Sequence, residues 1–342
     1  MALYNKIDRH ELKKRMEESA EKRMTISFYQ YHQLQDPQAF RDHLYASWTL
    51  LGVMGRVYIA TEGINAQISL PETNLSSFQE ALGRIDWLRG VRLNTAVDDD
   101  GKSFYKLIIK VRPKILADGL NDESFDVTDK GIHLTAEAFN ELTTSEDSVL
   151  IDMRNHYEHE VGHFKGAIKP DVDTFRDSLP IVEDILDAHR EKHIVMYCTG
   201  GIRCEKASAW LRHRGFEHVY QLEGGIIKYA RDVEAKGLEN RFIGKNFVFD
   251  ERLAERITDD VISNCHQCGK PCDTHTNCKN VTCNLLFIQC EECAATYEGT
   301  CCSECQDYLH LPAEKQLALR KGKDSGVRIF TKGRVKVEGE RQ

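Results

Sequence analysis

The stretch Tyr197-Cys198-Thr199-Gly200-Gly201-Ile202-Arg203 concentrates more chemistry than any other segment of this chain. It follows an apolar run, residues 193–196, that is typical of a short buried strand, and residues 204–214 have helical spacing. A cysteine between a strand and a helix lies at the edge of an open α/β sheet, where ligands bind. Backbone N–H groups of the glycine turn, the helix N-terminus and Arg203 all favour a thiolate. The stretch therefore predicts an α/β fold with Cys198 as nucleophile.

The length of this loop narrows the chemistry. Phosphatases that use cysteine have five residues between Cys and Arg, whereas four separate Cys198 from Arg203 here. The tighter ring of N–H donors suits a sulfur atom bound to the cysteine better than a phosphate. This arrangement resembles that of the rhodaneses, in which the cysteine carries a persulfide. A buried structural cysteine is the alternative, but Gly-Gly and Arg together favour catalysis. We predict that Arg203 stabilises the thiolate, and that the active-site loop consists of Thr199, Gly200, Gly201 and Ile202.

The flanking segments resemble the rhodanese signature over residues 130 to 236. Residues 149–154 are predicted to form a strand ending in Asp-x-Arg, and Glu158 precedes Gly-His-Phe-Lys-Gly-Ala at residues 162–167. Residues 219–226 resemble the closing strand and its Gly-Gly turn. We expect Asp152 and Arg154 to support the rim of the site, Arg154 also being a candidate substrate contact. His163 is expected to anchor a loop, and Cys204 to be a buried thiol rather than one that resolves an oxidised Cys198.

Composition places the chain among ordinary globular proteins. Its 342 residues suggest two or three domains, and its hydrophobic fraction of 41% is typical of a soluble fold. No apolar run is long enough for a membrane span, and residues 1–15 lack the apolar core of a signal peptide. Ten of the twelve cysteines fall between Cys265 and Cys305, which favours metal ligation over disulfides. We therefore expect a cytoplasmic protein without a membrane partner.

The N-terminal part is predicted to be a separate ferredoxin-like domain. Its sequence indicates strands at 25–31, 55–60, 64–70 and 104–111, and helices at 37–51 and 75–88. The resulting βαββαβ order fits a ferredoxin-like sandwich, also called acylphosphatase-like. Substrate docking is the role we expect, and a purely structural role is the alternative. The predicted parts are 1–112 for this domain, 113–130 for a linker, 131–240 for the rhodanese-like domain, 241–312 for a Cys-rich region and 313–342 for a basic tail.

The Cys-rich region predicts two metal sites. Cys265-x2-Cys268 and Cys290-x2-Cys293 have the separation of a zinc ribbon, so these four are the expected first site. The second site would take four of the other six cysteines. The ligands of the two sites could alternate along the chain, as in cross-braced zinc fingers. These six are Cys272, Cys278, Cys283, Cys301, Cys302 and Cys305, of which the last two form a further Cys-x2-Cys pair. Structural zinc is favoured because it would stabilise a segment with a small core. Free or redox-active thiols and iron–sulfur ligation remain the alternatives.

The C-terminal tail is basic in a chain of net charge −8. Its cations could neutralise phosphates, so it is equally compatible with nucleic-acid binding and with a solvated tail. The cations are Lys315, Arg320, Lys321, Lys323, Arg328, Lys332, Arg334, Lys336 and Arg341.

Taken together, the three parts resemble a known family over nearly the whole chain. The loop Tyr-Cys-Thr-Gly-Gly-Ile-Arg-Cys-Glu-Lys and the Cys-His-Gln-Cys-Gly-x-Pro-Cys motif are similar to those of the bacterial tRNA uridine(34) hydroxylases. The resemblance implies oxygen-dependent conversion of the wobble uridine of tRNA to 5-hydroxyuridine, with molecular oxygen as co-substrate. It also implies that Cys198 is the essential cysteine and tRNA the partner. No motif for an organic cofactor or a stable protein partner is evident, and the electron donor is not identified by the sequence.

The residues leave the mechanism and two further functions open. Cys198 could add to C6 of the uracil, or an oxidised or persulfidated Cys198 could deliver oxygen. The alternative enzyme is a sulfurtransferase that passes a persulfide to a small-molecule or protein acceptor. A non-catalytic tRNA-binding module is the third hypothesis, which the intact Cys198 and Arg203 disfavour.

Overall fold

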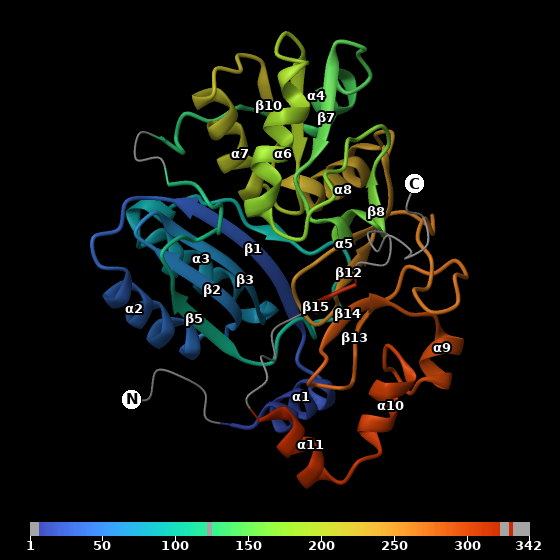
Figure 1. Cartoon of the computed structure of the whole chain (residues 1–342). Helices are drawn as coiled ribbons and strands as arrows, with labels where there is room; N and C mark the ends of the chain where they lie inside the picture. Colours follow the sequence, from blue (N-terminus) through green and yellow to red (C-terminus); the bar gives the residue numbers. More distant parts are fainter. Residues whose placement is uncertain (1–6, 122–124, 322–327, 331–342) are drawn as a thin grey trace.

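The computed structural model describes residues 7–121, 125–321 and 328–330, arranged in three parts (Figure 1). The N-terminal sheet lies beside the rhodanese-like unit. The Cys-rich part comes last in the chain and is drawn in orange and red. A first helix, α1 (Arg9–Glu18), precedes the sheet. The expected mixture of an α+β part and a parallel α/β part is confirmed. Within the described residues, no helix is long and apolar enough to cross a membrane.

The N-terminal part contains a five-stranded sheet in the order β4-β1-β3-β2-β5. Its strands are β1 (Arg23–Tyr31), β2 (Met54–Ala60), β3 (Gly63–Pro71), β4 (Asn94–Thr95) and β5 (Leu107–Val111). The first four give the ferredoxin-like order 4-1-3-2 with every neighbouring pair antiparallel. The predicted strand at 104–111 exists as β5, but it is a fifth strand that lies parallel to β2 at the opposite edge. Apolar alternation predicts that a strand forms and not which strand lies beside it.

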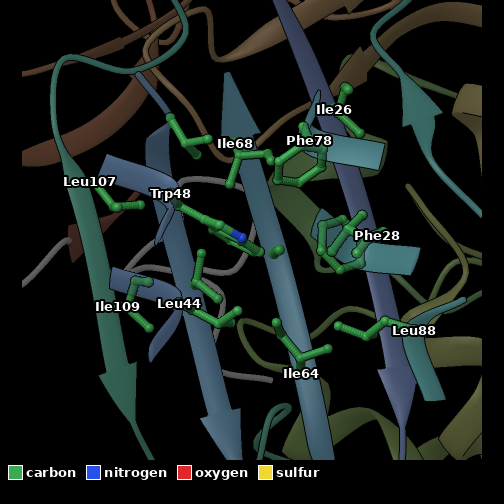
Figure 2. Packing of buried hydrophobic residues seen from close by; sticks show 14 of the residues in the cluster. Ile26, Phe28, Leu44, Trp48, Ile64, Ile68, Phe78, Leu88, Leu107 and Ile109 are labelled. Atoms are coloured by element: carbon green, nitrogen blue, oxygen red, sulfur yellow. The ribbon is translucent and has the colours of Figure 1, made fainter. Parts of the chain in front are cut away.

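One face of this sheet is apolar and is covered by α2 (Pro37–Leu50) and α3 (Leu75–Gly83). Figure 2 shows Phe28 of β1 and Ile68 of β3 packed with Trp48 of α2 and Phe78 of α3. The predicted second helix to residue 88 ends earlier, at Gly83, because glycine is a poor helix former. A 3-10 turn, η2 (Asp86–Leu88), follows it. Since side chains alternate along a strand, the opposite face carries the polar residues of β1, β2 and β3.

The rhodanese-like unit is built on a parallel sheet in the order β6-β10-β9-β7. Its strands are β6 (Ile132–Leu134), β7 (Ser148–Asp152), β9 (His193–Tyr197) and β10 (Val219–Leu222). Its helices are α4 (Ala136–Leu142), α5 (His156–His159), α6 (Phe175–Asp187), α7 (Ile202–His213) and α8 (Gly225–Lys236). Apolar clusters on both faces bury this sheet, as expected for parallel strands. Helix α7 begins at Ile202, two residues earlier than predicted.

Short strands connect the rhodanese-like unit to the Cys-rich part. Strand β11 (Phe242–Phe247) pairs with β8 (Gly162–Phe164) and β12 (Ala254–Arg256). The Cys-rich part contains β13 (His275–Asn277), β14 (Leu285–Ile288) and β15 (Arg328–Ile329). Its helices are α9 (Glu291–Thr296), α10 (Ser303–Leu309) and α11 (Ala313–Arg320). Of the predicted basic tail, residues 322–327 and 331–342 lie outside the described residues, so its role stays a prediction.

Candidate active site

Cys198 lies directly after β9, at the carboxyl end of a central strand, and is completely buried. The N–H of Gly201 donates a hydrogen bond to its Sγ atom at 3.1 Å. Gly201 has φ of 101°, a conformation that L side chains rarely adopt, and it precedes the first residue of α7. The glycine turn therefore directs a backbone donor and a helix N-terminus at the sulfur, as the sequence predicted.

The surroundings of Cys198 favour its thiolate. Burial raises the pKa of the thiol, but a hydrogen bond from Cys204 and the charge of Arg203 lower it more, to about 6. Burial and the neighbouring Cys198 raise the pKa of Cys204 well above its usual value. Cys204 therefore stays protonated and donates to the thiolate. At neutral pH the site holds one thiolate and one thiol in contact, which is the charge state of a nucleophile and its donor.

Arg203 is held by a carboxylate whose role the sequence analysis missed. Its Nη2 atom donates to Oε2 of Glu158 at 2.7 Å, and Nη1 donates to Oε1, which makes the pair bidentate. Glu158 is completely buried and also accepts from the N–H of Asn155 at 3.0 Å. The Asn-x-x-Glu spacing of a helix capping box was the available signal. Arg203 thus contributes its charge from a fixed position rather than as a mobile side chain.

The predicted rim residues form an internal support. Asp152 accepts from Arg154 at 2.9 and 2.6 Å and from the hydroxyl of Tyr197 at 2.6 Å. Arg154 also donates to the carbonyl of Gly162 and is completely buried. Arg154 is thus paired with Asp152 inside the protein, and its expected contact with substrate stays a prediction. His163, on β8, contacts the carbonyl of the next residue, Phe164, at 3.0 Å and the ammonium group of Lys169 at 2.9 Å, and its expected role as a loop anchor stays a prediction.

Helix α8 closes the loop from the other side. The N–H groups of Ile226 and Ile227 donate to the carbonyls of Cys198 and Thr199, at 3.0 and 3.2 Å. Gly225 has φ of +66°, and a Cβ atom there would lie 2.5 Å from the carbonyl oxygen of Cys198. Only glycine permits this approach, which explains the Gly-Gly turn that the sequence placed after β10.

Cys198 is one of the residues that line a cavity of about 1020 Å³, which the N-terminal sheet helps to enclose. The polar sheet face forms one wall, and residues 113–121 and 248–250 form others. The hydroxyl of Tyr29 donates to Glu205 at 3.2 Å, and Asn94 donates to the carbonyl of Gly200 at 3.3 Å. A Cβ atom on Gly201 would lie 2.9 Å from the Tyr29 hydroxyl. Two strands of the N-terminal sheet thus contact the cysteine loop, although they lie more than 100 residues away in sequence.

Three arginines give the cavity a positive wall. Arg56, Arg112 and Arg176 line it from separate segments. Within the part of the chain that the structure describes, none of them has a carboxylate in an ion pair, whereas Lys114, Arg203 and Arg252 of the same lining do. In a chain of net charge −8, such unpaired cations are suited to an anionic ligand.

The Cys-rich part gathers eight thiols into two clusters. Cys265, Cys268, Cys290 and Cys293 form one, and Cys278, Cys283, Cys301 and Cys305 form the other, with all sulfur atoms of a cluster within 4.8 Å. The two sets alternate along the chain, which is a cross-braced order. Cys301, rather than Cys302 of the Cys-x2-Cys pair, joins Cys305: the two sulfur atoms lie 3.7 Å apart, whereas Cys302 is the N-cap of α10. Cys272 and Cys302 belong to neither cluster.

The spacing within the clusters fits a tetrahedral metal. Sulfur atoms lie 3.6 Å apart for Cys268 and Cys290, and 3.7 Å apart for Cys283 and Cys301. Four sulfurs at the zinc–sulfur bond length of about 2.3 Å from a common centre would lie about 3.8 Å apart. All twelve cysteines are free of disulfides. The donor set and its geometry therefore fit a closed four-thiolate site.

Comparisons with known proteins agree with this architecture. The chain matches models of the "UPF0176 acylphosphatase like domain" at residues 23–115, of the "Rhodanese-like domain" at 135–232 and of "Rhodanase C-terminal" at 243–306. It is 55% identical over 97% of its length to a "tRNA uridine(34) hydroxylase" of Yersinia pestis, of which it covers 94%. The chain belongs to the tRNA uridine(34) hydroxylase family. A relative from Pectobacterium atrosepticum with the same name is 54% identical over the same shares.

The match to a solved rhodanese-like domain from Anabaena covers 33% of this chain and 78% of the Anabaena chain. The two are 22% identical, and the TM-score is 0.26. The name shared by the hydroxylase relatives describes an oxidoreductase reaction. Family membership therefore favours the hydroxylase hypothesis over the sulfurtransferase hypothesis.

Proposed function

We propose that this protein hydroxylates the wobble uridine of tRNA to 5-hydroxyuridine, with molecular oxygen as co-substrate and Cys198 as the reacting residue. The observation that carries the proposal is the position of the Cys198 thiolate in a cavity with unpaired arginines and polar and aromatic side chains. Arginines bind phosphates, and tyrosines such as Tyr29 and Tyr58 can stack on bases of single-stranded RNA. Sulfur transfer to a small molecule requires neither feature.

The polar sheet face of residues 1–112 serves in this proposal as the docking surface for the anticodon loop. A cavity of about 1020 Å³ is at the upper end of small-ligand sites. It can therefore admit an unstacked nucleotide, which enzymes that modify a base must extract from its stack. Arg112, which directly follows β5, contributes to the same wall. Since tRNA and a reducing environment for free thiols are both found in the cytoplasm, we place the protein there.

For the chemistry we propose addition of the Cys198 thiolate to C6 of the uracil. The new C–S bond moves the electron pair of the C5–C6 double bond onto C5 and O4. This pair then forms a bond from C5 to one atom of dioxygen, and the other oxygen atom takes up a proton, which gives a C5 hydroperoxide. An external thiol reductant supplies the two electrons that convert the C5 hydroperoxide to an alcohol and water. Loss of the C5 proton and of the Cys198 thiolate then restores the ring. Arg203 and the N–H of Gly201 stabilise the departing thiolate.

Nucleoside mass spectrometry of tRNA tests this function. A deletion strain is complemented with wild type, Cys198→Ser or Cys302→Ser, the last being a cysteine outside both the loop and the clusters. We expect 5-hydroxyuridine-derived nucleosides to return with wild type and Cys302→Ser only. Full hydroxylation by Cys198→Ser would rule out a role of this sulfur in the reaction.

We also propose that each cysteine cluster holds a structural zinc ion. The four thiolates of a cluster would fill all ligand positions, so the ion would contribute folding energy and no open position for substrate. Metal analysis of the purified chain should give two zinc ions per molecule. Cys265→Ser should lose one of them, and Cys302→Ser should keep both. Iron in place of zinc, with visible absorption, would instead support an iron–sulfur site.

A further inference from the structure

We infer that Gln67, on the N-terminal sheet, binds the N3 edge of the target uracil and selects uracil over cytosine. This inference rests on the proposed function and identifies the group that recognises the base. It arises from a row of side chains that begins at the cysteine loop and crosses the sheet.

The row is set by the strand register. Asn94 of β4 is paired with Ser27 of β1, Ser27 with Gln67 of β3, and Gln67 with Arg56 of β2. All four residues line the cavity. Asn94 contacts Gly200 of the cysteine loop, and Ser27 Oγ would lie 3.9 Å from a Cβ on Gly200. Because neighbouring strands are about 4.8 Å apart, Gln67 lies one strand further from the loop than Ser27.

The side-chain amide of Gln67 is held in one orientation. Asn65 donates from Nδ2 to the carbonyl of Ile115 at 3.3 Å, and a backbone carbonyl can only accept. The amide of Asn65 must therefore present Oδ1 to its neighbour, and Gln67 donates from Nε2 to this atom at 2.5 Å. Gln67 is left with its Oε1 acceptor and one further N–H donor. Asn65 is buried, which protects this relay from solvent.

These two remaining groups match uracil. Uracil presents the N3–H donor beside a carbonyl acceptor, so Oε1 can accept from N3–H while Nε2 donates to the carbonyl oxygen. Cytosine has an unprotonated N3 that would face Oε1, lone pair against lone pair. Cytosine would need the reversed amide, which the Ile115 carbonyl and Asn65 oppose. In the pyrimidine ring N3 lies opposite C6, so a base held at N3 by Gln67 can direct C6 toward Cys198.

The neighbouring residues support a base in this position. Tyr29, Asn65 and Tyr58 form the adjacent row across β1, β3 and β2 and also line the cavity. Aromatic side chains on a ferredoxin-like sheet are a recurrent way to stack unpaired bases. Ser27 lines the cavity, and its buried Oγ atom has no hydrogen-bond partner among the described residues. Arg56, at the end of the Gln67 row, can reach an adjacent phosphate.

Equilibrium binding of anticodon stem-loop RNAs under anaerobic conditions tests the inference. The RNAs are identical except for uridine, cytidine or 3-methyluridine at position 34. We expect wild type to bind the uridine form about 5- to 150-fold more tightly than the other two, the usual value of one bidentate base contact. Gln67→Met should bind all three within about twofold. Gln30→Met, a similarly half-buried glutamine of β1 outside the cavity lining, should retain the wild-type preference.

Two results would overturn the inference. One is equal binding of uridine and 3-methyluridine RNA by wild type, a comparison that needs no folded variant. The other is a Gln67→Met protein with the full uridine preference. Hydroxylation is measured separately on the same wild-type preparation. A uridine preference that depends on Gln67 but yields no 5-hydroxyuridine would reject the proposed reaction and support the base contact. Product formation without that dependence would reject the base contact alone.

Discussion

Removal of the Cys204 thiol should raise the pKa of Cys198 and so move the acid limb of the pH–rate profile to higher pH. Burial opposes ionisation of Cys198, and the hydrogen bond from Cys204 is the largest of the effects that lower its pKa to about 6. Hydrogen bonds to charged groups contribute about 1.5–3 kcal/mol, and one pKa unit corresponds to about 1.4 kcal/mol. Cys204→Ala should therefore raise the pKa of Cys198 to between about 7 and 8.

The consequence is a defect that depends on pH. At pH 7 the thiolate fraction should fall from about 0.9 to between about 0.5 and 0.1, a loss of about 2- to 10-fold in rate. The assay is the pH profile of kcat/KM for hydroxylation, which reports groups of the free enzyme. The variant should regain its rate at pH 9, and Cys302→Ala should follow the wild-type profile. An acid limb that stays near pH 6 in Cys204→Ala would refute the hydrogen-bond argument.

Further predictions concern stability and the loop. The folded pKa of Cys198, about 6, lies below an unfolded value of about 8.5, so its thiolate stabilises the fold above pH 8.5 and loses this effect as pH falls through 6. The difference in free energy of unfolding between wild type and Cys198→Ser should thus drop by about 3 kcal/mol from pH 9 to pH 5 in denaturant titrations; no change would contradict it. Glu158→Gln leaves the buried Arg203 without its carboxylate and should lower the free energy of unfolding by about 3–5 kcal/mol in the same titrations. A decrease below about 1 kcal/mol would be inconsistent with a buried ion pair. Gly225→Ala should reduce hydroxylation more than 10-fold, about 1.4 kcal/mol in barrier, because its Cβ atom would meet the carbonyl of Cys198, whereas Gly237→Ala, also at positive φ but in open space, should not.

Local sequence patterns located the central strands of the rhodanese-like sheet and the cysteine loop. Apolar runs located β7, β9 and β10, because a parallel strand buried on both faces is apolar along its length. The Cys198–Arg203 spacing indicated a thiolate turn, since all the groups that lower the pKa lie within seven residues of one another. The two Cys-x2-Cys pairs at 265–268 and 290–293 likewise stand together in one cluster. In the cysteine loop, and within each Cys-x2-Cys pair, the interacting groups are close in the chain, so the local spacing indicates the geometry.

Contacts between distant segments required the folded chain. Glu158 reaches Arg203 across 45 residues, and Tyr29 and Asn94 reach the loop from another part of the protein. The position of β5, the choice of Cys301 over Cys302 and the amide relay from Ile115 to Gln67 also depend on packing. The capping box indicates only the local bond between Glu158 and Asn155, and none of these long-range contacts has a sequence pattern of its own, because each depends on which surfaces pack together. The sequence therefore predicts the nucleophile, Cys198, while the cavity that it lines forms only where strands of the N-terminal sheet come to lie beside the cysteine loop.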